Sequence, residues 1–415
     1  MHIFFGFSEV ANYYSHLVKG LDQLNVNYTF LSWGKSIRNY SIDENPSIEQ
    51  NLLHYFARNT KQNFLLRYFQ KSIFYCVRVF LFFKYLYISD VFVFSYNASF
   101  LGGWDLPIMK LCNKKIIYIY YGSDSRPPFI SGNFIGHNKS TKSIKISTKN
   151  IYKKIKWREK FADEIVCLPG SAQFFDRDLI NFSWLGMPFS ITSQNPPTKP
   201  HRIPRVIHAP TEKKGKGTAE IIRIINELTD DGLSFEFKLL HNVTNDLVLE
   251  TLTDTDILID EMYSDTMLGG LGTEAASKGV CTIVGGYHGA ELNAGDQSLT
   301  PPCFYVSPDK IKETLKFLIE NKQKRDEVGR VAYKYVKRKL SPDVVAKKLL
   351  QIIDGTVPSE ARFDPCLIRN INGWGCSEHE LKSELKQYVD DHDYKSLYLS
   401  HNRELLNEYR LALAN

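Results

Sequence analysis

The sequence predicts an α/β fold of two lobes, each a parallel sheet with helices on both faces. Apolar runs that do not alternate with polar residues recur between stretches of helical periodicity, the pattern of strands buried on both faces of a sheet. At 415 residues the chain exceeds the size of one ordinary core. A stretch rich in proline, serine, threonine and lysine, residues 190–204, divides the alternation into two halves.

The first half begins with a predicted strand at residues 2–7, HIFFGF. This segment lacks the basic n-region and the continuous apolar stretch of a secretory signal, so we expect a buried strand. Ser8 is the predicted N-cap of a following helix whose apolar residues share one face. Further strands are predicted at residues 27–33, 90–96, 115–122 and 163–170.

The second half repeats the alternation. Its predicted strands are residues 205–209, 235–241, 256–260, 281–286 and 303–306, and its predicted helices are residues 218–229, 245–252, 273–278 and a long helix from Pro308. The expected boundaries are a first Rossmann-like lobe at 1–190, a linker at 191–204, a second Rossmann-like lobe at 205–355 and a helical extension at 356–415. Open α/β sheets bind ligands beyond the carboxyl ends of their strands, which here predicts an interlobe cleft.

The composition is that of a globular protein, with 43% hydrophobic and 24% charged residues and a net charge of +6. Seven cysteines without a C-x-x-C pair argue against a disulfide framework or a zinc site and favour a reducing cytoplasm. Residues 73–94 are very apolar, but Arg78, Lys84 and Asp90 interrupt them. Each charge costs about 2.5–3.5 kcal/mol at a bilayer centre, so no transmembrane helix is predicted.

A basic and aromatic segment precedes the third strand. Residues 50–89 contain six basic residues and no acidic one, with phenylalanine, tyrosine and leucine between them. Two interpretations stay open: residues 51–88 lie against an anionic membrane surface, or they form solvated helices whose aromatic residues fill the core. Nucleic acid is not an expected partner, because no recognition motif accompanies the charge.

The stretch RVIHAPTEKKGKGTAEIIRIINEL, residues 205–228, predicts an anion site. A short buried strand ends at Pro210, a loop of lysines and glycines follows, and a helix begins near Thr218. Free N–H groups, the positive end of the helix dipole and ammonium groups would converge there. The alternative is a solvated basic loop.

A second stretch, residues 254–286, ends a buried strand in Asp260 and Glu261 and continues into a glycine-rich loop. The next predicted helix opens at Thr273 and Glu274. A carboxylate in a first helical turn can accept two hydrogen bonds from a vicinal diol such as ribose. The alternative is that Glu274 complements the dipole of its own helix, an effect of about 0.3–1 kcal/mol.

Four segments, in this order, resemble the GT-B glycosyltransferases of family 4. They are ADEIVCLPG with FSWLGMPFS, HAPTEKKGKGT, DILIDEM with GGLGTEAASKGVCTIVGG, and VGRVAYKYVKRKLSPDVVAKKLLQII. The resemblance implies two lobes around a cleft and the transfer of a sugar from a nucleoside-diphosphate donor. It also implies that Lys216 contacts the diphosphate, with Lys213 or Lys214 as a second cation. The other implied contacts near the diphosphate are His208, Gly217 and Thr218.

Glu274 matches the glutamate that holds the ribose in this family. The earlier glutamate of the family falls on Thr266, so Asp265 or the backbone around Gly269 and Gly270 is expected to take its place. This departure leaves the catalytic details open, and a retaining reaction is favoured over an inverting one.

In the first lobe, Tyr121 stands where the family has a histidine. Gly122, Asp124 and Arg126 remain, and Ser8 lies in the other loop expected to face the acceptor. Asp124 is a candidate catalytic base or acceptor-positioning carboxylate, and the alternative is an Asx-type turn cap.

Two D-x-D sequences, residues 176–178 and 254–256, lie at element edges. We therefore expect neither a metal nor another cofactor, because lysines and a helix N-terminus would neutralise the leaving group.

The resemblance thus predicts a metal-independent, hexosyltransferase-type enzyme of the cytoplasm that is peripheral on the inner face of the cell membrane. It would transfer a sugar from a nucleotide sugar to a glycan or lipid-linked acceptor in bacterial surface polysaccharide synthesis. Two alternatives stay open: a nucleotide-sugar epimerase on the same fold, and a non-catalytic partner subunit. The sequence predicts neither the oligomeric state nor the role of residues 356–415.

Overall fold

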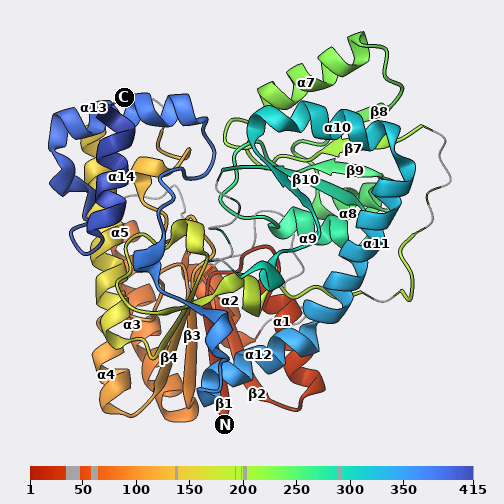
Figure 1. Ribbon diagram of the computed structural model, residues 1–415. Helices are drawn as coiled ribbons and strands as arrows, with labels where there is room; N and C mark the ends of the chain where they lie inside the picture. The colour runs from red at the N-terminus through yellow and green to blue at the C-terminus, as the bar shows by residue number, and fades with distance from the viewer. Residues whose placement is uncertain are drawn as a thin grey trace.

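The computed structural model describes residues 1–33, 47–57, 64–135, 139–191, 193–197, 199, 203–287, 289, 292, 294 and 296–414. Two sheets form its framework, one in each lobe (Figure 1). In spatial order, the first contains β12 (Arg362–Phe363), β6 (Leu179–Asn181), β5 (Glu164–Cys167), β4 (Lys115–Ile119), β3 (Val91–Ser95), β1 (His2–Phe7) and β2 (Asn27–Ser32). The second contains β11 (Phe304–Val306), β10 (Cys281–Gly285), β9 (Ile257–Ile259), β7 (Arg205–His208) and β8 (Glu236–Leu239). The strands pair in parallel, apart from β12, which runs antiparallel to β6. The predicted α/β fold with two lobes is confirmed.

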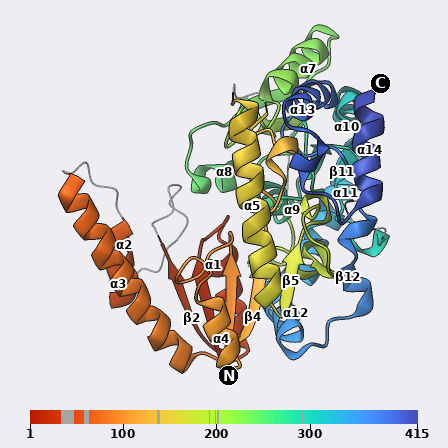
Figure 2. The same cartoon turned by 90° about the vertical axis from the view of Figure 1, so that its left-hand side faces the viewer.

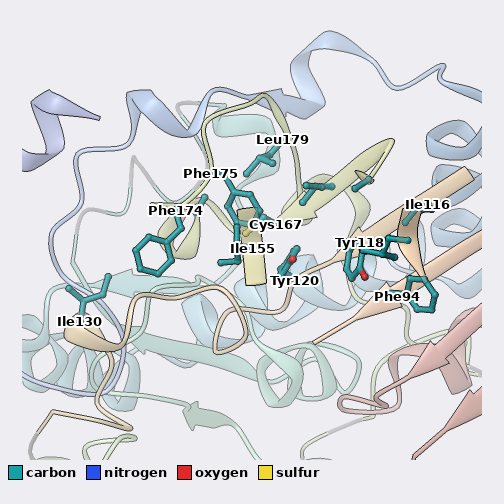
Figure 3. Close-up of a cluster of buried hydrophobic side chains, with 14 of the residues drawn as sticks. Phe94, Ile116, Tyr118, Tyr120, Ile130, Ile155, Cys167, Phe174, Phe175 and Leu179 are labelled. Atoms are coloured by element: carbon teal, nitrogen blue, oxygen red, sulfur yellow. The ribbon is translucent and has the colours of Figure 1, made fainter. Parts of the chain in front are cut away.

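Helices cover both faces of the first sheet. They are α1 (Tyr13–Gln23), α2 (Ile48–Ala57), α3 (Phe64–Ile88), α4 (Leu106–Leu111), α5 (Thr141–Phe161), α6 (Phe182–Leu185) and, from far along the chain, α12 (Pro342–Asp354). Neighbouring residues of β1 point to opposite faces. Ile3 and Phe5 pack with residues of α1 and α12, while Phe4 packs with residues of α3 and α5. Figure 3 shows part of the core that contains Phe4, where Ile155 of α5 lies near Tyr120, which follows β4.

The second sheet is also covered on both faces. Its helices are α7 (Thr218–Asp230), α8 (Asn245–Leu252), α9 (Gly270–Ala276), α10 (Ile311–Glu320) and α11 (Lys322–Lys339). Apolar residues of α7 and α10 pack on one face, and those of α8 and α9 pack on the other. The second sheet faces the first lobe across the middle of the molecule (Figure 1).

The C-terminal extension packs on the first lobe, which answers a question that the sequence left open. Its helices are α13 (Glu378–His392) and α14 (Arg403–Ala414). Short 3-10 helices lie at η1 (Pro128–Ile130), η2 (Pro169–Ser171), η4 (Gln297–Leu299), η5 (Pro308–Lys310), η6 (Ser359–Ala361), η7 (Pro365–Leu367) and η8 (Tyr394–Leu397). Tyr388 of α13 and Tyr409 of α14 both contact the ring of Phe129 in η1.

Helix α12 departs from the predicted boundary at residue 355. Residues 205–355 were expected to form the second lobe, yet Val345, Leu349 and Ile352 of α12 lie in a first-lobe core. The approach to α1 is close, since a Cβ on Gly20 would lie 2.0 Å from the carbonyl oxygen of Pro342. The chain thus returns to the first lobe at Pro342.

Two predicted helices differ in extent. The helix expected after Ser8 begins only at Tyr13, because Ala11 and Asn12 adopt left-handed conformations with φ of 48° and 59°. The long helix expected from Pro308 is divided into α10, α11 and α12. It breaks at Asn321, which has non-helical angles, and at Ser341, whose extended conformation is typical of a residue before proline.

Candidate functional site

A cavity of about 550 Å³ lies between the lobes at the carboxyl ends of the second-lobe strands. Thr211 follows β7, Asn245 begins α8, and Gly270 and Glu274 belong to α9. Ala11, in the loop after β1, supplies a wall from the first lobe. A Cβ on Gly270 would lie only 3.3 Å from the Cβ of Ala11, so the two lobes meet at this point. The cavity occupies the predicted interlobe cleft.

A larger hollow, of about 780 Å³, lies at the amino ends of the same strands. Arg205, on its lining, forms ion pairs with both Glu236 and Asp254. Because open α/β sheets bind ligands at the carboxyl ends of their strands, the interlobe cavity is the better candidate.

Glu274 lies on the wall of the cavity and is 7% exposed. Burial raises the pKa of its carboxyl to about 7, and a hydrogen bond with Asn245 offsets this only in part. Helix α9 begins at Gly270, earlier than predicted, so Glu274 lies beyond the first turn. At this position Glu274 does not complement the dipole of its own helix, because that effect is confined to the first turn. Its carboxyl is therefore available to a ligand.

Lys216 also lines the cavity, but its ammonium group is already paired. It contacts Glu261 Oε1 and lies 3.4 Å from Asp260 Oδ1. Burial acts to lower the pKa of Lys216, but the two carboxylates outweigh burial and raise it. Lys216 is therefore a charged residue that a second anion can reach only by competing with carboxylates of the chain.

The backbone N–H groups of the lysine and glycine loop already bind a carboxylate of the chain, that of Glu212. The Glu212 carboxylate accepts hydrogen bonds from the backbone N–H groups of Lys214, at 2.8 Å, and Gly215. The ammonium of Lys214 faces outward and lies 3.7 Å from Glu380. Gly217 caps α7 with φ of 66°, and a Cβ there would collide with Met262 at 2.2 Å.

His208 and Thr218 lie behind the loop and bind each other. Burial lowers the pKa of His208 to about 4, so its imidazole is neutral. Its Nδ1 lies 2.8 Å from the carbonyl oxygen of Ile259 and must donate to it, so Nε2 accepts from the Thr218 hydroxyl at 2.9 Å. Both predicted donor-side residues therefore support the loop from within.

Arg126 and Asp265 join the lobes through a buried ion pair. Arg126 Nε and Nη2 donate to the two carboxylate oxygens of Asp265 at 2.6 Å each, with the side chains 6% and 2% exposed. Gly122, with φ of 117°, makes room for the guanidinium, since a Cβ there would lie 3.0 Å from Nη2. The two residues were predicted on the acceptor and the catalytic side, and the structure brings them together.

The remaining predicted residues lie apart from the cavity wall. Asp124 Oδ1 accepts the N–H groups of Tyr121 and Gly122 at 2.9 and 3.0 Å, which fits the turn-cap interpretation. Burial nevertheless raises the pKa of Asp124 to about 6. Thr266 lines a separate small cavity of about 40 Å³. The ring of Tyr121 packs against Tyr13 and Phe182. The carbonyl oxygen of Ser8 accepts a hydrogen bond from the Ser95 hydroxyl, and Gly269 is the N-cap of α9.

Among the residues that the sequence prediction missed is Trp374 of the C-terminal extension. Its indole Nε1 donates to Glu261 Oε2, and its ring lies over Gly215, where a Cβ would be 2.4 Å from Cη2. The Arg126 guanidinium carbon lies 5.8 Å from the centre of the indole. The sequence signal was the Gly-Trp-Gly run at 373–375, since glycines beside an aromatic residue indicate close backbone contact.

Two parallel-sheet lobes, a cavity between them at the strand ends, and an α12 that crosses back to the first lobe define the GT-B fold. The chain is similar to the sucrose-phosphate synthase of Thermosynechococcus elongatus, with a TM-score of 0.54 and 11% identity, over 86% of this chain and 99% of that one. It is also similar to Alr3699/HepE of Anabaena, solved in complex with UDP-glucose, with a TM-score of 0.50 and 11% identity over 86% and 100% of the two chains. At these identities the likeness shows the fold.

Neither the known protein-family models nor the curated proteins include a match to this chain. Within the described ranges, no helix has both the length and the hydropathy needed to cross a membrane. Family 4 membership and the roles of the individual site residues stay predictions from the sequence.

Proposed function

We propose that this protein is a glycosyltransferase that moves a sugar from a nucleoside-diphosphate donor to a glycan or lipid-linked acceptor. The observation that carries the proposal is the interlobe cavity, which has Glu274 and Lys216 on its second-lobe wall. A similar fold in Alr3699/HepE of Anabaena was solved with UDP-glucose and with UDP, which supports a nucleotide sugar as the donor.

In this proposal, Glu274 accepts hydrogen bonds from the ribose hydroxyl groups and Lys216 binds the diphosphate. Positive charge at Lys216 stabilises the negative charge that develops on the diphosphate as its bond to the sugar breaks. Gly269 and Gly270 let the backbone approach the sugar. The first-lobe loops around Ser8 and Tyr121 receive the acceptor. We further propose a metal-independent and retaining reaction in bacterial surface polysaccharide synthesis.

Replacing Glu274 with glutamine tests the donor site. The variant should bind UDP about tenfold more weakly, because the amide donates where the carboxylate accepted, and it should bind inorganic pyrophosphate as tightly as the unaltered protein does. Isothermal titration calorimetry with both ligands measures the difference. An equal loss for both ligands contradicts the ribose role. If the unaltered protein binds no member of a panel of nucleoside diphosphates, the donor site itself is excluded.

A second part of the proposal concerns the hairpin of α2 and α3, which projects from the first lobe (Figure 2). Lys84 pairs with Glu49, and Arg78 donates to the carbonyl oxygen of Phe100 at 2.6 Å, so these cations are used within the protein. Arg58 and Lys61 lie outside the described residues, as does the side chain of Arg67. Large apolar side chains make up most of the exposed surface of α2 and α3, with Lys71 and Ser72 exposed among them. These apolar residues are Leu52, Tyr55, Tyr68, Phe69, Tyr75, Phe80, Phe83, Tyr87 and Ile88.

We propose that this surface lies in the interfacial region of a membrane, where aromatic side chains are favoured. The attraction would then come mainly from apolar burial, and less from the positive charges that the sequence pointed to. This is consistent with α3, which carries no acidic residue.

Replacing Phe80, Phe83 and Tyr87 with serine should remove most of the binding to vesicles of phosphatidylethanolamine and phosphatidylglycerol. Co-sedimentation measures the bound fraction. The matched control replaces three exposed apolar residues elsewhere, Val331, Leu367 and Leu411, with serine. Equal binding by both variants and the unaltered protein contradicts the membrane proposal.

A further inference from the structure

Glu261 is shared between two partners that come from distant parts of the chain. One carboxylate oxygen, Oε1, contacts the ammonium of Lys216, and the other, Oε2, accepts the indole N–H of Trp374. The residue is 6% exposed, so little water replaces either partner. Within the described part of the chain, each oxygen has one such contact.

Trp374 is itself fixed by both lobes. Its carbonyl oxygen accepts a hydrogen bond from the N–H of Gly132 in the first lobe at 2.7 Å. The N–H of the next residue, Gly375, donates to the carbonyl oxygen of Tyr263 in the second lobe at 2.8 Å. The fit against the first lobe is tight, because a Cβ on Gly373 would lie 1.7 Å from the carbonyl oxygen of Ile130. The backbone on both sides of the indole is thus held by contacts to both lobes.

We propose that Trp374 is a positioning residue of the donor site, which holds the Glu261 carboxylate while an incoming diphosphate takes Lys216 from it. The inference rests on the proposed function of Lys216. Among the described residues, Lys216 is the cation paired with Glu261 Oε1, so a phosphate group that binds Lys216 competes with this oxygen for the ammonium. The carboxylate then keeps the indole N–H, which lowers the cost of the displacement.

Three other charged groups near the Glu261 carboxylate affect how strongly it binds Lys216. Asp260, next in the chain, also contacts Lys216 and repels Glu261. Arg126 lies on the far side of the indole and is neutralised by Asp265. Glu212 is held by the loop amides on the other side of Gly215. Without the indole N–H, Lys216 is the strongest remaining partner of Glu261, so the carboxylate competes harder with a phosphate.

The test is a double-mutant cycle with Trp374→Phe and Glu261→Gln. Trp374→Phe removes the indole N–H while keeping an aromatic ring, and Glu261→Gln removes the charge of the carboxylate. Inorganic pyrophosphate and UDP are the probes, and calorimetry gives their dissociation constants. Trp374→Phe should weaken both ligands about tenfold, and Glu261→Gln should strengthen them, because the competing charge is gone. In the Glu261→Gln background, Trp374→Phe should change neither affinity. The matched control is Trp104→Phe, since Trp104 is 77% exposed on the first lobe.

The outcomes separate the two proposals. If Trp374→Phe weakens the ligands equally in both backgrounds, the indole acts independently of Glu261 and the inference is overturned. Unchanged affinity in the single variant overturns it as well, provided that Lys216→Met weakens pyrophosphate. If the unaltered protein does not bind pyrophosphate, the proposed function and the inference fail together. Thermal unfolding of each variant shows whether an affinity change has a structural origin. Loss of the Trp374→Phe effect in the Glu261→Gln background supports the role of Trp374 in positioning Glu261.

Discussion

Replacing Arg126 with alanine should lower the free energy of unfolding by about 3–5 kcal/mol, the cost of leaving one member of a buried ion pair without its partner. Asp265 is 2% exposed and takes both of its charged hydrogen bonds from Arg126. The two residues are 139 positions apart and belong to different lobes. Loss of their ion pair should therefore also weaken the contact between the lobes.

Urea denaturation followed by circular dichroism measures this loss. The matched control is Arg223→Ala, because Arg223 pairs with Glu227 on the surface of α7 and is 70% exposed. That variant should change the free energy of unfolding by less than about 1 kcal/mol. The double variant Arg126→Met with Asp265→Leu should be more stable than Arg126→Ala, because it leaves no buried charge alone. A midpoint for Arg126→Ala equal to that of the control contradicts the assignment.

Replacing Lys216 with methionine should weaken the binding of pyrophosphate and UDP by about tenfold to a hundredfold, the worth of a charge-assisted hydrogen bond. It should also destabilise the protein, because Asp260 and Glu261 would be buried without the ammonium. Burial already raises the pKa of Glu261, against the pull of Lys216, and removing Lys216 raises it further. A group with a raised pKa loses stability as pH rises, so the deficit should be larger at pH 8 than at pH 5.

Calorimetry and thermal unfolding at the two pH values measure these effects. Lys316→Met on α10 is the matched control, since Lys316 is exposed to solvent. Unchanged pyrophosphate affinity in Lys216→Met would place the diphosphate elsewhere. A stability deficit that does not depend on pH would mean that the pKa of Glu261 is not raised when the lysine is absent.

The fold was predictable because its strands are local patterns. Runs such as residues 91–95 and 281–285 are mostly apolar and do not alternate with charged residues, and such runs indicate a sheet covered on both faces. The short strand β12 and the return of α12 to the first lobe were not predictable in this way. Two residues, Arg362 and Phe363, carry no strand signal, and the apolar stripe of α12 fits either lobe equally well.

The candidate site was predictable only as far as strand ends determine it. Lys216, Gly270 and Glu274 follow strands that end at one sheet edge, so their common position on the cavity wall follows from the order of the elements. The partners of these residues come from tertiary packing. No local pattern in the sequence indicated that Glu261 would bind Lys216 or that Trp374 would reach Glu261.

The return of the chain to the first lobe has a consequence for protein synthesis. Helix α12 and strand β12 complete the first sheet and its core, yet they are translated after the whole second lobe. The second lobe, residues 205–340, can fold as soon as it leaves the ribosome, because its sheet is contiguous in the chain. Until α12 and β12 emerge, the first lobe must wait with an open sheet edge and exposed apolar surface, and such surface favours aggregation of a nascent chain.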